Sequence, residues 1–181
     1  TYLLSFIVVP YETRVLGPTY YGKLGVATAI MVYFQLVIDF GFLLSATEDV
    51  SRNREDRGKV SRILTAVTID KIFLTIGSVI VLLVLCQILP SWREDRTFYL
   101  LFLIATAVNS MIPDYLYRGL EQMTAITVRT VAIKTFFTVM IVLLLKQPEQ
   151  YCIIPILNII GNTAALLGVY LHLYRQMNIR F

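Results

Sequence analysis

The 181 residues would fit one soluble domain by length alone, but 57% of them are hydrophobic and the mean hydropathy is +0.70. Ordinary globular domains are roughly 45–50% apolar. A water-soluble fold of this size has no interior large enough to hide that much apolar surface, so we predict a membrane protein. The net charge of +4 does not indicate nucleic-acid binding, because most Lys and Arg residues lie in short segments between apolar runs.

Six apolar segments follow one another along the chain. The first ends at Leu16-Gly17-Pro18 and would rise only about 15 Å as a helix over residues 2–11, so we expect a truncated first span. The other five are each near the ~20 residues that a spanning helix needs, and they cover residues 21–47, 63–89, 98–120, 124–145 and 151–174. We therefore predict an all-α, polytopic transmembrane helical bundle of about six spans, forming a single domain over residues 1–181.

The distribution of Lys and Arg predicts the orientation, because cytoplasmic loops carry an excess of both. One side has nine of them: Arg52, Arg54, Arg57, Lys59, Arg62, Arg118, Arg129, Arg175 and Arg180. The other side has five: Arg14, Lys23, Arg93, Arg96 and Lys146. We expect a cytoplasmic N-terminus, basic loop (49–62) and C-terminal tail, in the inner membrane of the cell. The basic loop could also bind anionic headgroups, so membrane lipids are expected partners.

Charged residues inside the predicted spans are the most informative feature of the sequence. An ionised side chain at the bilayer centre costs at least ~2.5–3.5 kcal/mol. Counted from the inner ends of their spans, Asp39, Lys71, Asp114 and Lys134 all lie about 10–15 Å deep. Four charges in one layer predict a bundle with a polar interior. Arg118 shares a helix face with Asp114 and could instead extend to the cytoplasmic interface.

Two interpretations of this layer remain open. Asp39 with Lys71, or Asp114 with Lys134, could form ion pairs that only fix the register of the helices. Alternatively, the cations could hold an anionic head group in a cavity while a carboxylate couples ion movement.

Enzyme chemistry has little support. His172 is the only histidine, so no Ser-His-Asp arrangement is available, and neither a Walker A loop nor a GxGxxG sequence occurs. The two cysteines lack zinc spacing, so we expect no metal site and no cofactor. Cys86 and Cys152 could form a disulfide, but two separate apolar side chains are the simpler interpretation.

Three stretches carry a family resemblance: VPYETRVLGPTYYG at 9–22, DFGF at 39–42 with SAT at 45–47 and NR at 53–54, and PDYLYRGLEQM at 113–123. In order and spacing they resemble the O-antigen and polysaccharide flippase family. That family belongs to the multidrug/oligosaccharidyl-lipid/polysaccharide transporter superfamily. The resemblance covers most of the chain to about Lys134.

The resemblance implies a longer transporter of two similar helical lobes around a central cavity, with this chain as most of the N-terminal lobe. It implies that polyprenyl-pyrophosphate-linked oligosaccharide repeat units are flipped across the membrane by alternating access, without ATP, for surface polysaccharide synthesis. Lys71, Lys134 and Arg118 would bind the pyrophosphate, and Asp39 and Asp114 would couple ion movement. A polysaccharide polymerase and glycosyltransferases are the implied protein partners.

Three alternatives stay open. One is a multidrug or metabolite exporter of the same superfamily, which an acid-dominated cavity would favour. Another is a membrane-embedded enzyme of polysaccharide synthesis, which is disfavoured because no loop exceeds about fifteen residues. The last is a membrane scaffold without transport activity, in which the charges inside the spans would be dispensable.

Overall fold

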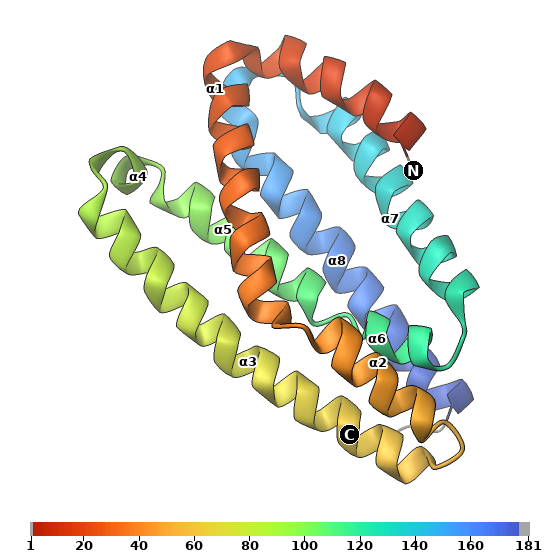
Figure 1. The fold of residues 1–181 in the computed structure, drawn as a ribbon. Coiled ribbons are helices and arrows are strands. Elements are labelled where there is room, and N and C mark those ends of the chain that lie inside the picture. Colours follow the sequence, from red (N-terminus) through yellow and green to blue (C-terminus); the bar gives the residue numbers. More distant parts are fainter. Residues whose placement is uncertain (1, 178–181) are drawn as a thin grey trace.

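The computed structural model describes residues 2–177, and within them the chain is a bundle of α-helices without strands (Figure 1). The helices are α1 (Tyr2–Asp39), α2 (Phe42–Arg52), α3 (Arg57–Ile88), α4 (Pro90–Glu94), α5 (Arg96–Ser110), α6 (Asp114–Gly119), α7 (Met123–Leu144) and α8 (Ile153–His172). A 3-10 turn (Pro148–Cys152) precedes α8 and a π-helical turn (Leu173–Met177) follows it. The all-α prediction is confirmed.

Among the residues that the structure describes, five helical stretches are long and apolar enough to cross a membrane: Val8–Arg52, Arg57–Ile88, Arg96–Gly119, Met123–Leu144 and Pro148–Arg175. The first two expected spans are joined in α1 through a kink at Gly17, whose φ of 68° is easily reached only by glycine. The remaining four expected spans each match one stretch. The prediction of a polytopic transmembrane bundle is therefore confirmed.

Two of the spans are interrupted near one end of the bundle. The chain breaks between α1 and α2 at Phe40 and Gly41, which have φ angles of 34° and 79°. It also breaks between α5 and α6, where Pro113 has no N–H group to continue a helix. The expected span at 98–120 matches the stretch Arg96–Gly119, but that stretch consists of two helices, α5 and α6, rather than one. Each break leaves the last carbonyl groups of a helix without partners from the helix itself.

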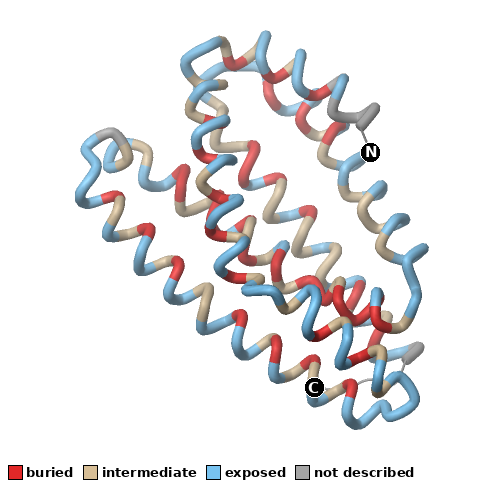
Figure 2. The backbone as a smooth tube through the Cα atoms, viewed as in Figure 1, coloured by how far each residue is buried: buried red, intermediate tan, exposed pale blue. Residues whose placement is uncertain are grey.

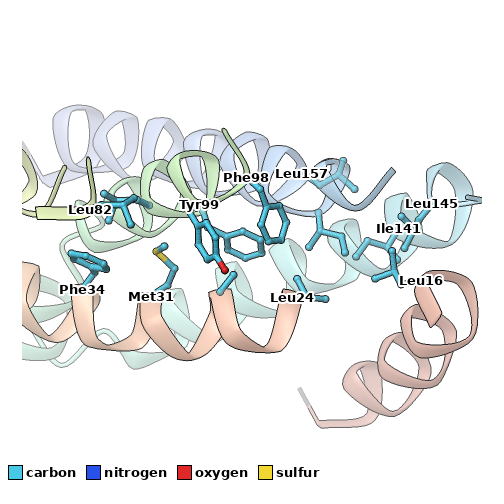
Figure 3. Close-up of a cluster of buried hydrophobic side chains, with 14 of the residues drawn as sticks. Leu16, Leu24, Met31, Phe34, Leu82, Phe98, Tyr99, Ile141, Leu145 and Leu157 are labelled. Carbon is cyan, nitrogen blue, oxygen red and sulfur yellow. The ribbon is translucent and has the colours of Figure 1, made fainter. Parts of the chain in front are cut away.

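The apolar core is divided into two clusters. The kink-end cluster, part of which is shown in Figure 3, comprises Val8, Leu16, Leu24, Ala27, Met31, Phe34, Leu82, Cys86, Phe98, Tyr99, Phe102, Leu103, Ile141, Leu145, Ile154 and Leu157. The α2-end cluster comprises Ala46, Val50, Val60, Leu64, Val67, Ile112, Tyr115, Leu116, Tyr117, Val169 and Leu173. In Figure 2 the buried positions follow the inward sides of the helices. Large apolar side chains such as Phe73, Ile76 and Ile80 are exposed on α3, as expected of a helix that faces lipid.

Candidate functional site

A polar layer separates the two apolar clusters on every spanning helix. Along each spanning helix, the polar residues lie between an apolar residue of one cluster and an apolar residue of the other. Gln35 and Asp39 lie between Phe34 and Ala46, and Lys71 lies between Val67 and Leu82. Asn109 and Ser110 lie between Leu103 and Ile112, Arg129 and Lys134 between Ile126 and Ile141, and Asn158 and Asn162 between Leu157 and Val169. Asp114 lies two residues after Ile112 and lines the same two pockets as these polar residues. The charges that the sequence analysis placed at one depth therefore lie in one layer of the fold.

Most of this layer lines two adjoining pockets. The large pocket measures about 640 Å³ and lies among α1, α5, α7 and α8, and the small pocket measures about 140 Å³. The two pockets share Gln35, Asn109, Ile112 and Asp114. Asp39, Lys71 and Arg118 line the small pocket, whereas Arg129 and Lys134 line the large one. All five predicted site residues thus line one or both of two pockets that share part of their walls.

Lys71 is held in the small pocket by two acceptors from other helices. Its Nζ donates to Asp39 Oδ1 at 2.8 Å and to the backbone carbonyl of Ser110 at 2.6 Å. Asp39 ends α1 and Ser110 ends α5, so both acceptors lie where a span is interrupted. Helix C-termini carry partial negative charge, so the buried ammonium group neutralises the Asp39 carboxylate and the terminal carbonyl of α5.

A second ion pair joins α6 to α7. Arg129 Nη2 lies 2.6 Å from Asp114 Oδ1, and the exposed fractions of the two side chains are 15% and 34%. The sequence analysis considered Lys134 as the partner of Asp114, and that pairing was wrong. Asp114 begins the short helix α6, and only residues 120–122 separate the end of α6 at Gly119 from the start of α7 at Met123. Arg129 is nearer to this end of α7 than Lys134 by five residues, or about 7.5 Å along the helix.

Two cations at the site form no ion pair with any residue that the structure describes. Lys134 is exposed within the large pocket, and Arg118 is exposed beside the small pocket. The large pocket has two cations, Arg129 and Lys134, against one carboxylate, Asp114. The small pocket has two of each sign. Asp114 lines both pockets and is paired with Arg129, so each pocket has one cation in excess: Lys134 in the large pocket and Arg118 in the small pocket.

Side-chain amides supply the other polar groups of the large pocket. Asn162 donates to the carbonyl of Ala105 at 3.3 Å. Gln35, Asn109 and Asn158 line the same pocket and hydrogen-bond to none of the described residues. The Nε of Arg129 is buried and also lacks a partner among them. The lining of the large pocket can therefore bind an anion through its cations and, beside it, an uncharged polar group through its amides.

Two members of the site, Arg129 and Gln35, were not predicted from the sequence. Arg129 was counted with the cytoplasmic cations, although its position five residues before Lys134 in the same span was a usable signal. Gln35 is uncharged, and its one-turn spacing from Asp39 was the only indication. Within residues 2–177 no group of three metal-ligating side chains is close enough to hold a metal ion, and Cys86 and Cys152 are free thiols.

Several apolar spans that turn charged side chains toward pockets within the bundle define a multi-spanning membrane protein as the class of protein. Comparison with known sequences agrees. Residues 1–181 match the sequence model of the family described as “Polysaccharide biosynthesis protein”, and the chain belongs to that family.

Two relatives carry the name “Putative O-antigen transporter”. The one from Escherichia coli (strain K12) is 30% identical over 130 residues, which is 72% of this chain and 31% of the relative. The one from Shigella dysenteriae is 26% identical over 152 residues, covering 82% of this chain and 37% of the relative. The chain thus spans about a third of the length of these relatives. No solved structure matches it significantly.

Proposed function

We propose that the protein translocates polyprenyl-pyrophosphate-linked oligosaccharide repeat units across the cytoplasmic membrane for surface polysaccharide synthesis, and that this chain is most of the N-terminal lobe of the transporter. One observation carries the proposal: Lys134 faces a pocket inside the membrane-spanning bundle without a carboxylate partner, which leaves that pocket with excess positive charge. The names of the two relatives support a polysaccharide-related substrate.

A pyrophosphate group needs such a site because it would lose its hydration shell on entering the bilayer. Ammonium and guanidinium groups in a low-dielectric pocket replace water as its partners. Two of the donors of Lys71 are engaged by Asp39 and Ser110, so Lys134 is the better placed cation for the substrate, with Arg118 at the neighbouring pocket. The polyprenyl tail would remain in lipid between helices.

The two carboxylates would couple transport to ion movement. Asp39 and Asp114 each hold one cation, so a proton or metal cation that bound either carboxylate would weaken its ion pair. Lys71 or Arg129 would then be freed toward the substrate. Rocking of this lobe against a second lobe would expose the pocket to each side in turn, without ATP.

We also propose that the α2 end of the bundle is cytoplasmic. The α2–α3 connection at 53–56 lies at this end, as does the end of α8 (Figure 1), and the segment 49–62 carries five of the sixteen Lys and Arg residues. Leu43 of α2 and Arg118 of α6 line the small pocket, so a substrate made in the cytoplasm would have a short path to it.

The test uses the full-length gene in cells that lack their own copy, with surface polysaccharide as the readout and immunoblotting of membranes as the check on insertion. Lys134→Ala should lower surface polysaccharide at least about tenfold, because a charged hydrogen bond contributes about 1.5–3 kcal/mol. Lys146→Ala is the matched control, since Lys146 is exposed and lies outside both pockets. Normal polysaccharide in the Lys134→Ala strain would contradict the proposal. Changed resistance to cationic drugs instead would favour an exporter.

A further inference from the structure

The large pocket has a wall that a pyrophosphate group would leave unused. We call it the amide wall and define it as Gln35 on α1, Asn109 on α5 and Asn158 on α8. Each of these side chains offers two N–H donors and a carbonyl acceptor. None forms a hydrogen bond with a described residue, although Asn162 on the same pocket does. At this depth in a membrane protein, free amides need a polar partner that enters the pocket.

The threonines around the wall add acceptors but no free donors. Four of them line the large pocket, and each donates its hydroxyl proton to the carbonyl four residues earlier in its own helix: Thr28 to Leu24, Thr106 to Phe102, Thr130 to Ile126 and Thr138 to Lys134. Their oxygen lone pairs remain available. The side-chain donors of the pocket are therefore the three free amides, the second N–H of Asn162, Lys134 and Arg129.

We propose that the amide wall binds the first sugar of the lipid-linked substrate and determines which glycan the transporter accepts. This inference rests on the proposed function. A sugar ring is uncharged and displays hydroxyl or acylamino groups that both donate and accept, which is the chemistry that the amides and threonine oxygens complement. Lys134 on the same pocket would hold the adjoining pyrophosphate.

The size and the remaining walls of the pocket suit this occupant. Its volume of about 640 Å³ lies within the roughly 300–1,000 Å³ of typical ligand pockets. Phe102 and Phe137 line it and present apolar surface against which the C–H groups of a sugar can pack. A pocket that hydrogen-bonds its ligand rejects an analogue lacking those groups more strongly than an apolar pocket does. The amide wall is thus a specificity determinant beside the cationic site.

The test measures binding of two probes to the purified full-length protein in detergent. One probe is the polyprenyl-pyrophosphate-linked repeat unit isolated from the host, and the other is polyprenyl pyrophosphate without sugar. Asn109→Leu and Asn158→Leu each remove the amide at similar volume. Gln87→Leu is the control, because Gln87 is an exposed amide on α3 outside both pockets. Each pocket variant should lose about 3- to 10-fold in affinity for the glycolipid and change less than about twofold for the bare lipid.

The outcomes separate this inference from the proposed function. Equal losses for both probes, or no loss for either, would overturn the sugar-binding role of the amides. If Lys134→Ala still weakens both probes in those cases, the proposed function stands without the inference. If the wild-type protein binds neither probe, both fail. Should Asn158→Leu not fold, Asn109→Leu decides the question, because Asn109 is already exposed in the pocket and needs no repacking.

Discussion

Replacing Lys71 with methionine tests how the interrupted spans are held together. The change removes the ammonium group that lies 2.8 Å from Asp39 Oδ1 and 2.6 Å from the carbonyl of Ser110. Breaking a buried ion pair by removing one partner typically costs 3–5 kcal/mol. The Asp39 side chain is 31% exposed and keeps part of its hydration, so we expect the lower end of that range. Lys71→Met should therefore lower the free energy of unfolding by about 3 kcal/mol.

A double-mutant cycle shows whether the loss comes from this ion pair. Asp39→Asn removes the carboxylate charge that Lys71→Met leaves unpaired, so the double variant should be more stable than the sum of the single effects by about 1–3 kcal/mol. The assay is reversible unfolding of the purified full-length protein by sodium dodecyl sulfate. Lys59→Met is the control, because Lys59 is 62% exposed and contacts Asp56 only at 3.8 Å. A change below about 0.5 kcal/mol for Lys71→Met would refute the reasoning.

Three further predictions follow from the packing, the second ion pair and the topology. Gly119→Ala should destabilise by about 1–3 kcal/mol in the same unfolding assay, because the added methyl would lie 2.6 Å from Val50 Cγ1. Arg129→Gln should destabilise by about 1 kcal/mol, and a further Asp114→Asn change should recover part of that loss, because both members of the ion pair are then uncharged. A cysteine at Glu55, in a protein without other cysteines, should react with an impermeant thiol reagent only after the membrane is opened.

Each of these predictions has a matched control. Gly77→Ala should leave stability unchanged or slightly raised, because nothing lies within 4 Å of the added methyl. Asp114→Asn alone should be less stable than the double variant, and additive losses would show that the two side chains do not interact. A cysteine at Glu149, which is exposed at the other end of the bundle, should react in intact cells. Reaction of the Glu55 cysteine in intact cells would reverse the proposed orientation.

The spanning helices could be predicted because hydropathy and helix length depend on local sequence. Each segment of about 20 apolar residues is helical, although two of them are divided between two helices. The sequence also indicated the kink at Gly17 and the turn at Pro148. The break at Pro113 was missed because the residues on both sides are apolar enough to continue the span. Whether such a proline bends or interrupts a helix depends on what satisfies the freed carbonyls, and here Lys71 from another helix does so for Ser110.

The depth of the charges could be predicted, but their partners could not. Counting residues from the span ends placed Asp39, Lys71, Asp114 and Lys134 in one layer, because the rise per residue of a helix is constant. Partner choice depends on how α6 turns into α7, which no local pattern encodes. Arg129 therefore forms the ion pair with Asp114, and Lys134 has no ion pair among the described residues. The roles of these residues in transport remain predictions.

The most direct test of the central claim measures the rate at which the lipid-linked repeat unit crosses the membrane of vesicles that contain the purified full-length protein. A hydrolase added outside the vesicles would report how fast the substrate appears there. Wild type and Lys146→Ala should transfer it at equal rates, and Lys134→Ala at least about tenfold more slowly, because the pocket would lose its unpaired cation. Equal rates for all three proteins would show that the charged pocket does not carry the substrate.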